Sequence, residues 1–404
     1  MNSNKPFAFQ AMVKPIGAAC NLNCTYCYYL EKQKLYKNTG SFRMSDELLE
    51  KFIKQYIAVQ QVDTIQFVWQ GGEPTLLGLD YFRKIVTLQK KYAAGRQIDN
   101  AFQTNGTLLD DEWCAFFKKH NFLVGISIDG PKHVNDAHRS FQTGAPSFDK
   151  VMNGINLLRK HQVDFNTLTV IHRDNVMYGL EIYNFLKLIG SGFIQFIPII
   201  ERAKRVTDSD SLNLVGPDAP EAYVTDWSVR PDDYGNFLIS VFNEWVKHDV
   251  GKVFVQQFDA TLANWVGESP GICVFSETCG DAVVVEHNGD VYSCDHYVYP
   301  EFKLGNIKEA TLFTIVKSDR QREFGQNKLL KLPQQCISCE YRFACHGECP
   351  KHRFLKTADG EPGLNYLCSA YKKFFTHVHP YMQFMGDELK GNRAPSNVMA
   401  WVKL

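Results

Sequence analysis

The amino-acid sequence predicts an α/β fold: a curled, partly open parallel barrel followed by a smaller domain that is held together by metal. Up to about residue 200, six short apolar runs alternate with helical patterns, which is typical of βα units that build a parallel sheet. Six such units are fewer than the eight of a closed barrel. The rest of the chain carries most of the twelve cysteines and few long periodic elements, as a small metal-stabilised domain does.

The six predicted strands are short and rich in aromatic or β-branched residues. They cover residues 9–14, 64–69, 98–103, 123–128, 165–171 and 193–199. The first helix is expected to start at Ser45, because Asp46 and Glu47 then lie in its first turn and apolar residues follow at helical spacing. The other barrel helices are predicted over 80–92, 110–120, 148–160 and 176–189.

The barrel sheet is expected to end near Arg202. Residues 203–235 are polar and contain three prolines, which predicts a loop or linker, and a helix is expected over about 234–248. On this basis the chain divides into a barrel at 1–235, a linker helix region at 236–265 and a cysteine-rich domain with a C-terminal helix at 266–404.

Charge and hydropathy exclude several classes of partner. The 44 basic and 44 acidic side chains balance, so nothing favours electrostatic capture of nucleic acid or of an anionic membrane. No apolar run is long enough to span a bilayer, and residues 1–8 lack the charged-then-apolar layout of a signal peptide. We therefore expect a cytoplasmic protein, in which cysteines bind metal or clusters more often than they form disulfides.

Cys20, Cys24 and Cys27 lie on one loop directly after the first predicted strand. Three thiolates on a short loop can bind three irons of a 4Fe–4S cluster and leave the fourth iron open. The open iron can bind the amino and carboxylate groups of S-adenosylmethionine (SAM), whose reductive cleavage releases a 5′-deoxyadenosyl radical. The alternative is a structural zinc site, which would need a fourth ligand. Tyr26, between two of the ligands, packs either on the adenine of SAM or only over the cluster.

The segment 20–27 resembles the signature loop of the radical SAM superfamily, and the resemblance extends through residue 200. It implies a partial (β/α)6 TIM-like barrel as the radical SAM core. Gly71, Gly72 and Glu73 follow the second predicted strand, as the superfamily's motif for the SAM amino group does. The glycines would let the backbone approach the ligand, and Glu73 would accept from its ammonium; a simple turn is the alternative.

The same resemblance implies three further SAM contacts. Ser127 ends the fourth predicted strand and corresponds to a contact with the ribose and carboxylate. Arg139 has a planar guanidinium group that can bind the methionine carboxylate through two donors. Without the surrounding motifs, a surface charge would be the expected role of this residue. Ile200, at the end of the sixth strand, lies beside the adenine or, alternatively, in the core.

The remaining cysteines form a second field. Cys114 lies inside a helical pattern, where a small buried apolar role is expected, and the other eight fill two complete four-thiolate sites. Their spacing, with Gly289 among them, matches the SPASM domain, the C-terminal extension of radical SAM enzymes that modify peptides. By this resemblance, one auxiliary 4Fe–4S cluster is bound by Cys273, Cys279, Cys294 and Cys349, and a second by Cys336, Cys339, Cys345 and Cys368. Two structural zinc sites are the alternative.

Residues 27–32, 69–75 and 293–307 resemble anaerobic sulfatase-maturating enzymes, a resemblance that covers nearly the whole chain. That family oxidises a Cys or Ser in an unfolded sulfatase, within a Cys/Ser-x-Pro/Ala-x-Arg segment, to Cα-formylglycine. The resemblance implies that the adenosyl radical takes a hydrogen atom from the target Cβ, a base removes the thiol or hydroxyl proton, and an electron passes to an auxiliary cluster. It also implies a low-potential electron donor such as flavodoxin or ferredoxin, and no nucleic-acid or membrane partner.

Asp295 is the predicted catalytic base, because it directly follows the predicted ligand Cys294 and so places a carboxylate between cluster and substrate. The alternative is a carboxylate that only orients the ligand loop. Tyr29 and Gln103 are expected at the barrel mouth, either holding substrate backbone or packing. Two other functions remain as alternatives: a SPASM maturase that forms thioether or carbon–carbon crosslinks, and a zinc-binding interaction module.

Overall fold

A computed structural model describes residues 6–36, 42–190, 192–206 and 211–403 of the chain. The expectation about the first eight residues therefore falls mostly outside the described residues. Among the described residues, no helix combines the length and apolar character that crossing a membrane requires.

All six predicted strands form, and each pairs in parallel with the next. They are β1 (Gln10–Lys14), β2 (Thr64–Trp69), β3 (Gln97–Thr104), β4 (Phe122–Ser127), β5 (Phe165–Ile171) and β6 (Phe193–Pro198). In β5 every second residue is buried, and β2 buries the aromatic rings of Phe67 and Trp69 completely. The predicted partial barrel is therefore confirmed, with each strand end within one or two residues of its expected place.

The sheet does not end near Arg202, which corrects the prediction. It has ten strands: β10 (Phe254–Val255) joins β6 in parallel, and β11 (Ala282–Glu286) joins β1 in parallel. The antiparallel strands β12 (Asp290–Tyr292) and β13 (Lys303–Asn306) extend the sheet beyond β11. β11 covers the backbone edge of β1 along all five of its residues, so the cysteine-rich part shares one sheet with the barrel.

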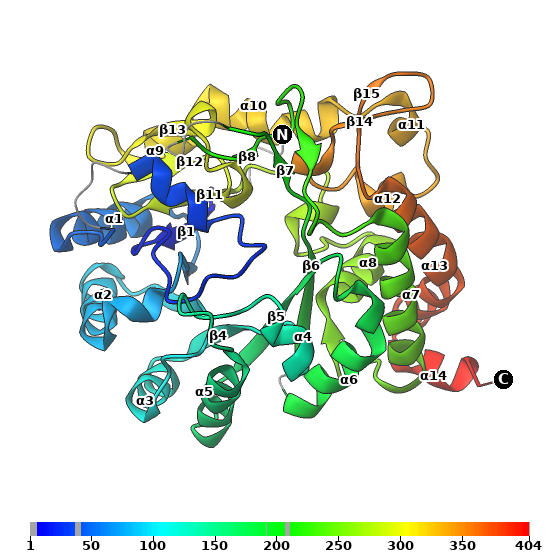
Figure 1. The fold of residues 1–404 in the computed structure, drawn as a ribbon, viewed down its shortest axis with the longest axis horizontal. Helices are drawn as coiled ribbons and strands as arrows, with labels where there is room; N and C mark the ends of the chain where they lie inside the picture. The colour runs from blue at the N-terminus through cyan, green and yellow to red at the C-terminus, as the bar shows by residue number, and fades with distance from the viewer. Residues whose placement is uncertain (1–5, 37–41, 191, 207–210, 404) are drawn as a thin grey trace.

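The helices that follow the strands lie on the outer side of the sheet (Figure 1). They are α1 (Asp46–Val59), α2 (Leu79–Tyr92), α3 (Asp111–Lys119), α4 (Lys132–Asp136), α5 (Phe148–Lys160) and α6 (Gly179–Ile189). Ser45 caps α1 as predicted, because its side chain accepts from the backbone N–H of Leu48 at 3.3 Å. Asp110 caps α3 in the same way through Trp113. The apolar faces of these helices pack on the strands and form one continuous core.

Residues 203–235 are not simply a linker, which is a second correction. Within the described part they contain a small antiparallel sheet of β7 (Arg202–Ala203), β8 (Leu214–Val215) and β9 (Tyr223–Val224), followed by the start of α7 (Pro231–His248). Two-residue strands are too short to produce an alternating pattern, so the sequence gives no signal for them. Residues 207–210 lie outside the described residues.

The last part of the chain is built of short elements and one long helix. They are α8 (Gln256–Val266), α9 (Leu312–Val316), α10 (Asp319–Leu330), α11 (Gln334–Ile337), α12 (Arg342–Cys345), β14 (Leu355–Lys356), β15 (Pro362–Leu364), α13 (Cys368–Lys390) and α14 (Val398–Trp401). The long helix α13 packs beside α7 and α8, on the right of Figure 1. The expected boundary at 235 falls inside α7, and the division into three units stays a prediction.

Candidate functional site

The cysteine loop after β1 is fixed against a segment that is distant in sequence. The backbone N–H of Asn23 donates to Ser140 at 2.8 Å, and that of Thr25 donates to His138 at 3.1 Å. Arg139 lies between these two acceptors and is therefore held beside the loop. Cys20, Cys24 and Cys27 all line one cavity of about 370 Å³ at the carboxyl ends of the barrel strands, where the loops of parallel α/β sheets build their sites.

The glycines after β2 hold the cysteine loop in place. Gly72 donates its N–H to Gly17 at 2.7 Å, and Glu73 donates to Ala19 at 2.8 Å. A Cβ on Gly72 would lie 1.9 Å from the carbonyl oxygen of Ala19, so only glycine fits this close backbone approach. Both Gly71 and Gly72 also line the cavity, as predicted for residues beside a ligand.

The carboxylate of Glu73 is engaged with the protein. It accepts from the backbone N–H and hydroxyl of Thr75, from the hydroxyl of Thr104 and from the backbone N–H of Asn105, at 2.7 to 3.0 Å. Burial raises its pKa, and these hydrogen bonds partly offset that effect. Glu73 is fully buried and is not among the residues that line the cavity. These hydrogen bonds show that Glu73 stabilises the turn after β2, which was the alternative role. Its contact with the ammonium of SAM stays a prediction.

Tyr26, Asp129 and Arg139 form a buried polar group at one side of the cavity. Tyr26 donates its hydroxyl to Asp129 and accepts from Arg139 Nη1 at 2.9 Å. Burial raises the pKa of Asp129, and the charge of Arg139 offsets part of the rise. The Nε–H of Arg139 is buried and has no partner among the described residues, so it is a donor available to an anionic ligand. The sequence prediction missed Asp129, although it directly follows a strand end.

Six of the seven residues predicted to contact SAM line this cavity: Tyr26, Gly71, Gly72, Ser127, Arg139 and Ile200. Ser127 accepts from Gln103 Nε2 at 2.9 Å, which leaves its own hydroxyl hydrogen for another acceptor. A free buried guanidinium donor for a carboxylate, half-buried glycine backbone and an apolar wall fit an amino-acid ligand with an aromatic base. The residues present therefore fit SAM, and their individual contacts stay predictions.

Asp295 lines the same cavity from the cysteine-rich part of the chain. It opens a short 3-10 helix, η5 (Asp295–Tyr297), directly after Cys294, and its carboxylate accepts from the Tyr28 hydroxyl and pairs with Lys14. Burial alone would raise the pKa of Asp295, but the charge of Lys14 and these hydrogen bonds bring that pKa below its ordinary value. Asp295 and the residues predicted to contact SAM therefore line one cavity, and the role of Asp295 as base stays a prediction.

Lys14 and Tyr28 were not identified from the sequence. Lys14 ends β1, is 1% exposed and places its ammonium 3.4 Å from the centre of the Tyr29 ring. Tyr29 donates to the buried Glu286, the residue opposite Lys14 on β11. Tyr29 and Gln103 both line the cavity, but both are also tied to protein groups. A lysine at the end of a buried strand was the one signal that pointed to Lys14.

The pairing of the other eight cysteines into two ligand sets stays a prediction, with which the interactions among their thiols agree. Thiols raise one another's pKa within the first set (Cys273, Cys279, Cys294, Cys349) and within the second (Cys336, Cys339, Cys345, Cys368). All twelve cysteines are free thiols, and Cys114 is buried in the core as expected. Burial and mutual repulsion disfavour thiolates in both sets, and a cationic metal centre would stabilise the thiolates when bound. The donor sets fit two closed four-thiolate clusters.

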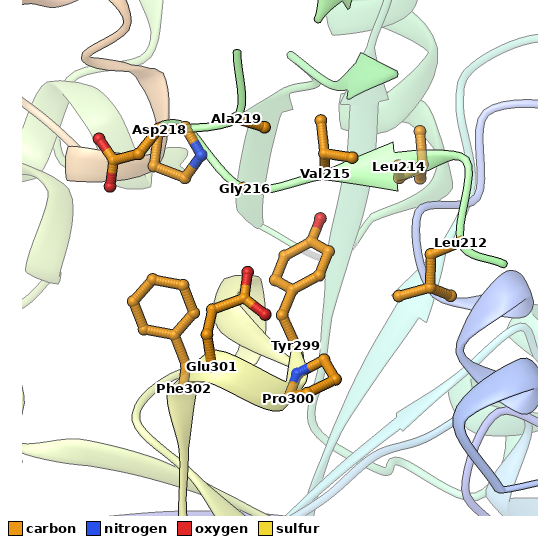
Figure 2. A pocket seen from close by; sticks show the side chains of 11 residues that line it. Leu212, Leu214, Val215, Gly216, Asp218, Ala219, Tyr299, Pro300, Glu301 and Phe302 are labelled. Carbon is orange, nitrogen blue, oxygen red and sulfur yellow. The ribbon is translucent and has the colours of Figure 1, made fainter. Parts of the chain in front are cut away.

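A separate hollow of about 390 Å³ lies outside this cavity, between segments 212–219 and 299–302 (Figure 2). Its lining is mostly aliphatic and aromatic, with the side chains of Tyr299 and Glu301 directed toward the strand that carries Val215. The ammonium of the buried Lys32 lies 3.4 Å from the ring centre of Tyr299. None of the predicted ligand cysteines lines this hollow, so it is distinct from the candidate site.

Comparisons with known proteins agree with this geometry. Residues 15–186 match the family model of the radical SAM superfamily, and residues 273–340 match that of an iron-sulfur cluster-binding domain. The chain is 54% identical to a serine-type anaerobic sulfatase-maturating enzyme of Bacteroides thetaiotaomicron, over 98% of this chain and 96% of the relative. It is 33% identical to a cysteine-type anaerobic sulfatase-maturating enzyme of Clostridium perfringens, over 94% and 98%.

A solved structure, native anSMEcpe with bound AdoMet and Cp18Cys peptide, has the same fold. It matches with a TM-score of 0.80 and 32% identity, over 94% of this chain and 99% of that one. The match spans both the barrel and the cysteine-rich part, and so it agrees with the single sheet that joins them.

Proposed function

The chain belongs to the family of anaerobic sulfatase-maturating enzymes, and from this we propose that it oxidises a serine of a sulfatase polypeptide to Cα-formylglycine. We choose serine as the target because the chain is 54% identical, over nearly its whole length, to a serine-type relative. The cysteine-type relative is 33% identical. The family membership also favours this function over the crosslinking maturase and the zinc module.

We propose three 4Fe–4S clusters and SAM as the groups that the enzyme uses. One cluster is held by Cys20, Cys24 and Cys27, and the two auxiliary clusters are held by the two four-cysteine sets described above. When bound, these groups supply a radical that takes one hydrogen atom from the target Cβ and an acceptor for one further electron. Arg139 orients the SAM carboxylate through its free Nε–H, and the Gly71–Gly72 backbone leaves room for the ligand.

The chain's own acid–base chemistry rests on Asp295. Oxidation of serine to an aldehyde removes one hydrogen atom, one proton and one electron, so a base must take the hydroxyl proton. We propose that the Asp295 carboxylate accepts this proton, because it lines the same cavity as the residues predicted to contact SAM. Lys14 and Tyr28 hold the carboxylate in one orientation by contacting both of its oxygens. Tyr29 and Gln103 remain candidates for contacts with the substrate backbone.

The substrate and its partners follow from the same family membership. We propose an unfolded sulfatase segment of the form Cys/Ser-x-Pro/Ala-x-Arg as the target, and a flavodoxin or ferredoxin as electron donor. We also propose that the reaction takes place in the cytoplasm, where cysteines bind metal clusters more often than they form disulfides.

An anaerobic assay with two matched peptides tests the function. The peptides differ only in serine or cysteine at the target position, and mass spectrometry follows the products. We expect the serine peptide to lose two hydrogens and to be converted faster than the cysteine peptide. A crosslinked product would instead identify a thioether or carbon–carbon maturase, and a faster cysteine reaction would contradict the serine assignment.

Iron content tests the first auxiliary ligand set. We expect Cys349→Ala to lose about four of about twelve irons per chain, because a closed cluster depends on all of its ligands. The matched control is Cys114→Ala, which removes a buried thiol outside both sets and should keep its full iron content. A Cys349→Ala protein with unchanged iron, or a colourless wild-type protein that contains zinc, would contradict the cluster assignment.

A further inference from the structure

One face of α10 contacts three of the four loops that carry the first auxiliary set. Gln321 Nε2 donates to the carbonyl oxygens of Gly280 at 2.9 Å and Ser293 at 3.1 Å, which adjoin Cys279 and Cys294. The carbonyl of Gly325 accepts from the backbone N–H of Cys279 at 3.2 Å. A Cβ on Gly325 would lie 2.2 Å from the carbonyl oxygen of Cys279, so the helix backbone touches the ligand loop directly.

Lys328 lies on this same face, one turn beyond Gly325. It is fully buried, and its ammonium donates to the carbonyl oxygens of Cys273 and Val274. The thiols that interact with its charge are those of Cys349, Cys273 and Cys279, all in the first set. A buried cation of this kind must be balanced by nearby negative charge.

The neighbouring carboxylate does not serve as the partner of Lys328. Glu348 is bonded to His352 at 2.8 Å and to Asn365 at 2.7 Å, and its effect on Lys328 is smaller than that of the three thiols. The first set of thiols is therefore the main source of negative charge near the Lys328 ammonium. A four-iron cluster with four thiolates carries net negative charge and supplies the balance that the ammonium needs.

The second set has no equivalent buried ammonium among its interacting groups in the described part of the chain. Two cations interact with its thiols: the exposed Lys372 with Cys368, and Arg353 with Cys336 and Cys345. Arg353 also interacts with Cys349 of the first set, and its donors are used by the backbone carbonyls of Gly347, His346 and Lys328. The thiols that interact most strongly with Lys328 all belong to the first set.

We propose that Lys328 is the buried counter-charge of the first auxiliary site and raises the reduction potential of that site. A positive charge stabilises the reduced, more negative form of a cluster, and this effect is strong where water is excluded. The inference rests on the proposed ligand sets and not on the identity of the substrate. Lys328 would thereby favour electron transfer from the substrate to the site beside Asp295.

Redox titration of the reconstituted full chain tests this proposal. Cys20, Cys24 and Cys27 are replaced by alanine in every sample, so that the auxiliary clusters alone give the electron paramagnetic resonance signal. The first site is identified as the signal that disappears in Cys349→Ala. In Lys328→Met we expect the equilibrium constant for reducing that site to fall at least tenfold, a shift of about 59 mV for one electron. The second site should keep its potential.

Three companion variants separate charge from packing and hydrogen bonding. Lys328→Arg keeps the charge and should retain the wild-type potential, whereas Lys328→Gln keeps a hydrogen-bond donor without charge and should behave like Lys328→Met. Lys331→Met removes an exposed lysine one turn away and should change neither site. A wild-type potential in Lys328→Gln, or equal shifts at both sites, would overturn the proposal. If Lys328→Met fails to hold iron, the Lys328→Gln titration decides the outcome. The peptide assay is separate, so failure of the proposed function would be recognised independently.

Discussion

In Asp295→Asn we expect cleavage of SAM to continue while formylglycine formation falls on the order of 10²- to 10⁴-fold, the range that general bases contribute. The amide has nearly the shape of the carboxylate but cannot accept the hydroxyl proton, and the three cysteines proposed to hold the SAM-binding cluster are unchanged. Release of 5′-deoxyadenosine and yield of the aldehyde are measured in the same reaction. Uncoupling of the two products is the signature of a lost base.

Two variants serve as controls for this prediction. Glu301→Gln changes an exposed carboxylate six residues further along the same segment and should leave both products unchanged. Tyr28→Phe removes one hydrogen bond to Asp295 but keeps the carboxylate, so we expect a smaller loss of product than in Asp295→Asn. Full product yield in Asp295→Asn would remove this residue from the mechanism.

Gly72→Ala is the second change with a large expected effect. The added Cβ would lie 1.9 Å from the carbonyl oxygen and 2.4 Å from the carbonyl carbon of Ala19, and backbone atoms cannot move aside as a flexible side chain can. To relieve this clash, the turn that contains Gly72 must move away from the cysteine loop. This movement breaks the hydrogen bond between the Glu73 N–H and the Ala19 carbonyl. We expect the free energy of unfolding to fall by about 2–4 kcal/mol and SAM cleavage to be lost.

Denaturant unfolding and iron content measure the effect of Gly72→Ala. The control is Gly216→Ala, where an added Cβ meets no atom closer than 3.8 Å and the stability should change little. If Gly72→Ala keeps wild-type stability and SAM cleavage, the close approach between turn and loop does not position the cluster. Loss of SAM cleavage with normal stability would point to ligand contact at Gly72 instead.

The barrel could be predicted because its strands and helices each carry a local periodic signal. Residues 64–69 and 165–171 were predicted as strands, and β2 and β5 have these same bounds, because short apolar runs flanked by helices leave little freedom. β11 was missed although its sequence is Ala-Val-Val-Val-Glu. A strand's partner is set by long-range pairing, and no local pattern shows that residue 282 lies beside residue 10.

The site shows the same limit. The cysteines could be singled out because their spacing is a chemical pattern in the chain, whereas Asp295 was proposed from its place beside Cys294 and from the family resemblance. Lys14 and Asp129 could not, because their roles depend on partners that only the fold brings close, Asp295 for the first and Tyr26 for the second. Glu73 is the opposite case: the motif suggested a ligand contact, and the structure gives its carboxylate protein partners.

The pairing of β11 with β1 has a consequence for how the enzyme can move. The two strands share five residue pairs in one sheet, with Lys14 opposite Glu286 at their ends. Rotation of the barrel and the cysteine-rich part as two separate rigid bodies would have to break this ladder of five paired residues. The ladder therefore holds the cysteine loop after β1 and the segment that carries Asp295 on one sheet.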